Sequence, residues 1–95
     1  MATATQSLFT ANDTDEELLQ CLSGTSELFE GSDKLDAALD AAVELIERKR
    51  ATKDTAFDDL VTLTSEVYGL DERRVEADVL DALSRRLFQI RRARG

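Results

Sequence analysis

The apolar residues of this chain recur every three or four positions, which is the spacing of one face of an α-helix. Over about 33–51, Leu35, Leu39, Val43 and Ile46 fall on one narrow stripe with alanines between them. Similar patterns predict further helices over about 15–30, 55–68 and 72–92. With four Gly and no Pro, the chain offers few of the turns that a small sheet needs. We therefore predict an all-α fold, a small bundle of about four helices joined by short turns.

The first predicted helix begins with a capping box at Thr14 and passes through a glycine. Leu18 and Phe29 share one face only if Gly24 is helical, so we expect a single helix here. Gly24 would weaken that helix by about 1 kcal/mol relative to alanine. Gly31 is then expected to end it in a left-handed conformation.

Polar residues and a glycine mark the ends of the other predicted helices. Ser32 is expected to cap the second helix, and Asp54 or Thr55 the third. Gly69 is expected to end the third helix and Asp71 to cap the fourth. Short links of this kind make consecutive helices antiparallel neighbours.

A chain of 95 residues is long enough for one hydrophobic core. We expect residues 1–13 to form a flexible lead-in and residues 14–95 a single helical domain. The predicted core comprises Leu18, Leu22, Phe29, Leu35, Leu39, Val43, Ile46, Phe57, Val61, Val67, Val79, Leu83 and Leu87.

The residue counts exclude several classes of chemistry. The chain has no His and a single Cys, Cys21, so it lacks the residues of catalytic triads and of the usual zinc and haem sites. Residues 12–17 resemble a calcium loop only superficially, because Gly24 stands where the bidentate Glu belongs. Glu44 and Glu47 lack the histidine partner of a di-iron site. We expect no catalytic residue, metal or cofactor.

No stretch of the chain approaches the roughly 18 apolar residues of a membrane helix, and the N-terminus has no basic residue. A lone cysteine cannot form an internal disulfide, which is typical of a reducing compartment. We therefore expect a cytoplasmic protein that does not enter membranes.

Charge is unevenly distributed along the chain, whose formal net charge is −8. Residues 1–47 contain eleven acids and one lysine, whereas residues 48–95 contain nine acids and eleven bases. The C-terminal bases either bind an acidic partner or a phosphate backbone, or they balance the acidic half. With Phe88, which lies off the apolar face, they form the candidate interaction surface: Arg85, Arg86, Phe88, Arg91, Arg92 and Arg94.

The segment from Thr64 to Leu70, followed by Val75, resembles the spacing of a helix-turn-helix, including winged-helix variants that bind peptides instead of DNA. Any helical hairpin with a glycine turn has similar spacing. The recognition helix would open with four carboxylates facing the phosphates: Asp71, Glu72, Glu76 and Asp78.

These patterns favour a non-catalytic interaction or adaptor protein that binds another protein through a helical face. The alternative is a nucleic-acid-associated regulator that uses the hairpin of about 60–83 and the arginine cluster, although the overall acidity argues against nucleic acid. A homodimer through the fourth helix is also predicted, with its seam at Leu80, Leu83, Leu87 and Ile90.

Overall fold

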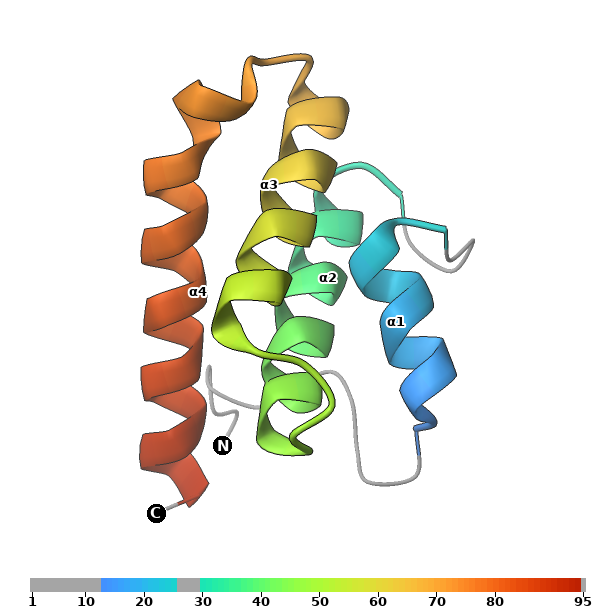
Figure 1. The fold of residues 1–95 in the computed structure, drawn as a ribbon, viewed down its shortest axis with the longest axis vertical. Helices are drawn as coiled ribbons and strands as arrows, with labels where there is room; N and C mark the ends of the chain where they lie inside the picture. Colours follow the sequence, from blue (N-terminus) through green and yellow to red (C-terminus); the bar gives the residue numbers. More distant parts are fainter. Residues whose placement is uncertain (1–12, 26–29, 95) are drawn as a thin grey trace.

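A computed structural model describes residues 13–25 and 30–94, which form four α-helices and no strand (Figure 1). The helices are α1 (Asp15–Ser23), α2 (Ser32–Glu47), α3 (Lys53–Tyr68) and α4 (Glu72–Arg94). Each helix runs antiparallel to the next, so α1 and α3 begin at the end of the bundle where α2 and α4 finish. The predicted all-α bundle is confirmed.

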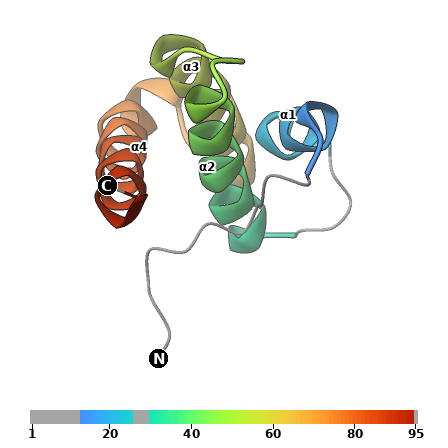
Figure 2. The same ribbon diagram turned by 90° about the horizontal axis from the view of Figure 1, so that it is seen from below.

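The two middle helices separate the two outer ones (Figure 2). Both α2 and α3 contact α1 and α4, and they also contact each other. Within the described residues, α1 and α4 do not touch. The bundle is therefore a central pair with one helix on either side, and α1 and α4 each keep an outer face.

α2 is buried around most of its circumference, more than the single predicted stripe requires. Ala38, Ala41 and Ala42 have no exposed surface, and their small side chains let neighbouring helices approach closely. The buried residues of α2 are Ala37, Ala38, Asp40, Ala41, Ala42, Val43, Glu44 and Leu45. Because α2 has three helical neighbours, charged positions outside the stripe are buried as well.

Three predicted helix ends are confirmed. The Thr14 hydroxyl accepts a hydrogen bond from the backbone amide of Glu17 at 3.2 Å. Gly69 has φ +65° and donates its amide proton to the carbonyl of Ser65, which ends α3. The carboxylate of Asp71 accepts from the amide two residues on, at 2.9 Å, where α4 begins.

Other helix ends differ from the prediction. α3 begins after Thr52, which forms a reciprocal capping box with Thr55. Ser32 is the first residue of α2 and not its cap, since Gly31, with φ +59° and ψ −134°, precedes it without a side-chain cap. α2 ends before the predicted position, and Lys49 just beyond it turns to φ +62°.

The first helix is shorter than predicted. It ends at Ser23 because Gly24 adopts the left-handed conformation, with φ +79° and ψ 12°. The Gly24 amide donates to the carbonyl of Cys21, and the Thr25 amide donates to that of Gln20 at 3.0 Å. These two bonds form a Schellman motif, which terminates a helix at a glycine. The prediction of a single helix that continues through Gly24 was therefore wrong.

The core agrees with most of the predicted set. Buried members are Leu18, Leu22, Val43, Val61, Val79, Leu83 and Leu87. Partly buried members that pack against them are Leu35, Leu39, Ile46, Phe57 and Val67. Phe29 lies outside the described residues, as do residues 1–12 of the predicted lead-in. The prediction missed buried side chains such as Leu45, Leu60 and Leu63.

Replacing Gly24 with Ala should lower the free energy of unfolding by about 1–2 kcal/mol, because an L-residue is strained in the left-handed region. The new Cβ would also lie 2.6 Å from Leu63 Cδ1, so that side chain must move. Gly69→Ala is the matched control, with φ +65° and nothing within 4 Å of its Cβ, and should cost less. Chemical denaturation measures both. If Gly24→Ala equals or exceeds the parent in stability, α1 continues through Gly24.

Candidate interaction surface

Two of the predicted arginines are paired with acids of α2. Arg86 Nε lies 3.2 Å from Asp40 Oδ1, and Arg91 Nε lies 3.2 Å from Glu47 Oε2. The Asp40 side chain is 3% exposed and that of Arg86 is 23% exposed. The Arg86–Asp40 contact is an ion pair without the alignment of a hydrogen bond. A buried carboxylate requires a nearby cation, so Arg86 is a structural residue of the α2–α4 interface.

Arg85 and Arg92 of α4 face solvent. Arg85 pairs with Asp81 one turn earlier, but both side chains are exposed, so the pair contributes little to stability. Arg92 is exposed and takes part in no ion pair within the described part of the chain. Arg94 is the last residue of α4, and its side chain lies outside the described part. Arg86 and Arg91 thus balance the acidic half, whereas Arg85 and Arg92 remain accessible.

A second ion-pair group holds the start of α1 against the end of α2. Arg48 donates to Asp15 at 2.9 Å and to Glu44 at 3.2 Å. The hydrogen bond with Asp15 raises the pKa of Arg48, which stays charged. Arg50 also pairs with Asp15, at 3.1 Å. The bases that follow α2 are therefore partly engaged within the chain.

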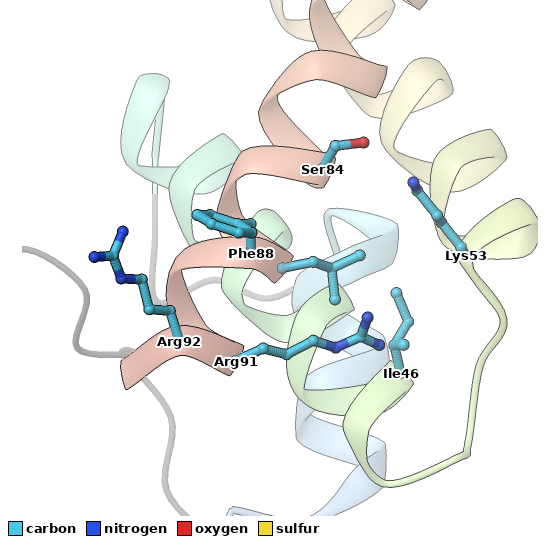
Figure 3. A pocket seen from close by; sticks show the side chains of 7 residues that line it. Ile46, Lys53, Ser84, Phe88, Arg91 and Arg92 are labelled. Carbon is cyan, nitrogen blue, oxygen red and sulfur yellow. The ribbon is translucent and has the colours of Figure 1, made fainter. Parts of the chain in front are cut away.

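An open cavity of about 450 Å³ lies beside Phe88 (Figure 3). Its lining comes from α2, α3 and α4: Ile46, Lys53, Ser84, Leu87, Phe88, Arg91 and Arg92. Phe88 is 64% exposed and extends from α4 to the same side as Arg92. Arg91 instead extends toward Ile46. We call this region the Phe88 surface, comprising these seven lining residues and Arg85.

The Phe88 surface combines an exposed aromatic ring, an apolar floor and several cations. Aromatic and arginine side chains are enriched in protein interfaces, because both cover a large area and arginine also forms directed hydrogen bonds. Carboxylates and apolar side chains of a partner would complement it. Among the described residues, no group of three acids or cysteines is placed to hold a metal ion.

The sequence predicted Phe88 and the arginines but missed Lys53 and Ile46. These two residues lie more than 30 positions earlier in the chain and join the surface only because α2 ends and α3 begins beside the end of α4. Short links between helices predict antiparallel packing, and that packing would have placed Lys53 and Ile46 at the same end of the bundle as Phe88.

The seam predicted for a dimer is largely used inside the chain. Leu83, Leu87 and Ile90 are 0%, 6% and 2% exposed and belong to the core. Leu80 is 47% exposed, so it and Phe88 are the large apolar side chains left on the outer face of α4. A dimer through α4 stays a prediction, but it would need a different set of contacts.

The hairpin of α3 and α4 does not have the arrangement of a helix-turn-helix. The two helices run antiparallel, side by side (Figure 1), whereas those of a helix-turn-helix cross at about 90–120°. Glu72, Glu76 and Asp78 are all exposed on the first half of α4. This hairpin is therefore poorly suited to the phosphate backbone.

Comparison with known proteins gives no relative: no protein-family model, no curated protein and no solved structure matches this chain. No helix in the described ranges has the length and apolar character needed to cross a bilayer. The geometry of the Phe88 surface is thus the basis for a functional proposal.

Replacing Arg86 with Ala should lower the free energy of unfolding by about 2–3 kcal/mol, because it removes an ion pair with the buried carboxylate of Asp40. Arg85→Ala is the control on the same helix and should change stability by no more than about 0.5 kcal/mol, since its pair is exposed. Urea denaturation of both variants provides the measurement. Equal losses would contradict a structural role specific to Arg86.

Proposed function

We propose that this protein is a non-catalytic interaction module that binds another protein through the Phe88 surface. The observation that carries the proposal is the exposure of Phe88, at 64%, among cations in a chain of net charge −8. An exposed aromatic side chain beside an apolar cavity marks a place where a partner can bury area. The absence of His from the sequence supports a binding function over catalysis.

The chemistry of this surface specifies a partner with both apolar and acidic side chains. Ile46, Leu87 and the Phe88 ring offer apolar contact, and Lys53 and Arg92 offer positive charge around it. Carboxylates of the partner would steer its approach and fix its orientation. The chain has a single cysteine, Cys21, which cannot form an internal disulfide, and this supports action in the cytoplasm.

A nucleic-acid-associated function is the weaker alternative. Arg86 and Arg91 already pair with acids of α2, which leaves few cations for phosphates. A polyanion would also be repelled by the net charge of −8.

A photoreactive amino acid at position 88 should capture a partner protein, whereas the same group at position 68 should not. Tyr68 is the matched control, because it is also an exposed aromatic residue, at 56%, but lies at the far end of α3. Arg92→Glu should weaken the capture at position 88, since the partner is expected to carry carboxylates. Mass spectrometry of the cross-linked species provides the readout. Identical species from both positions would overturn the proposed surface.

The protein should show no detectable binding to random duplex DNA at 0.15 M salt, because its net negative charge opposes the approach of a polyanion. Fluorescence anisotropy with a labelled duplex tests this. Binding that disappears when Arg85, Arg91 and Arg92 are changed to Gln would instead support the nucleic-acid alternative.

A further inference from the structure

The outer face of α4 carries one continuous stripe of accessible positions. Ala77, Leu80, Ser84 and Phe88 follow one another at steps of three or four residues, which places them on the same side of the helix. Leu80 is 47% exposed and Phe88 is 64% exposed. Ser84 lies midway between them, and its small side chain would let another helix approach closely. In the described structure, no helix covers this face (Figure 2).

Charge changes sign along the same helix. Glu76, Asp78 and Asp81 are exposed before Ser84, and Arg85, Arg91 and Arg92 are exposed after it. An antiparallel copy of α4 would set each acidic half against a basic half. Opposite charges facing each other across an interface favour one orientation and exclude the parallel one. Arg73 and Arg74 depart from this pattern, but they lie level with the open ends of such a pair, where solvent screens them.

We infer that the partner of the Phe88 surface is a second copy of this chain, bound through α4 in antiparallel orientation about a twofold axis at Ser84. This inference rests on the proposed function and names its partner. Leu80 of each copy lies level with Phe88 of the other, since both are four residues from the axis. A twofold interface uses the same patch twice, so each apolar and each charged contact occurs in duplicate.

The cavity beside Phe88 can accommodate Leu80 of the second copy. Helical geometry puts Leu80 on the side of the stripe toward Leu87, and Phe88 on the other side. The twofold axis then brings Leu80 of the second copy over the cavity floor at Ile46 and Leu87. Asp78 and Arg92 lie on one flank of the stripe, so Asp78 of one copy approaches Arg92 of the other.

Charge reversal of Asp78 and Arg92 tests this register. The two residues are about 21 Å apart along α4, too far to pair within one chain. Neither takes part in an ion pair among the described residues. Asp78→Arg and Arg92→Glu should each weaken dimerisation about tenfold, because each contact occurs twice. The double variant should recover the parent affinity.

Sedimentation at concentrations up to high micromolar measures the dissociation constant of each variant. Glu66→Arg, an equal charge change at an exposed site on α3, should leave dimerisation unchanged. Phe88→Ala should weaken it, and thermal denaturation should show that every variant folds. A monomeric parent, or a double variant no tighter than the single ones, overturns the dimer. If the parent is monomeric while position 88 still captures another protein, the proposed function survives and the second copy is excluded.

Discussion

Alanine on α2 sets how closely the other helices can approach, and the rest of the bundle depends on that approach. Ala38, Ala41 and Ala42 are completely buried in a helix that touches all three others. Larger side chains at these positions would push a neighbour outward and open gaps elsewhere in the core. The larger residues Leu18, Leu60 and Leu83 of the surrounding helices are buried in the same core cluster as these alanines.

The same crowding explains why two acids lie inside the bundle. Asp40 and Glu44 are 2% and 8% exposed because helices cover α2 on several sides, including those where its polar residues fall. Each acid faces an arginine, Arg86 from α4 or Arg48 from the end of α2. The uneven charge of the sequence is therefore partly compensated by ion pairs in the folded chain, and two further cations, Lys53 and Arg92, line the cavity beside Phe88.

The sequence predicted the fold class because each helix has a clear apolar face and because residues such as Thr14 and Asp71 mark helix starts. It did not predict the end of α1, because the apolar residues beyond Gly24 continue the helical spacing while a left-handed glycine stops the helix. The spacing of apolar residues identifies one buried face of a helix, so it could not show that α2 is also covered on the side of Asp40. The candidate surface was found only in part for the same reason, since Lys53 reaches Phe88 through packing.

Because α1 is short, the reactivity of Cys21 toward oxidants and alkylating agents depends on whether this helix is packed. A helix of nine residues is not stable alone in water, so α1 is helical while it packs against α2 and α3 and loses its structure when it detaches. Cys21 is 5% exposed in the packed state. Attack on this sulfur by an oxidant or an alkylating agent therefore requires the helix to come away first. Once modified, the enlarged side chain could not return to its place, so brief detachment would become permanent.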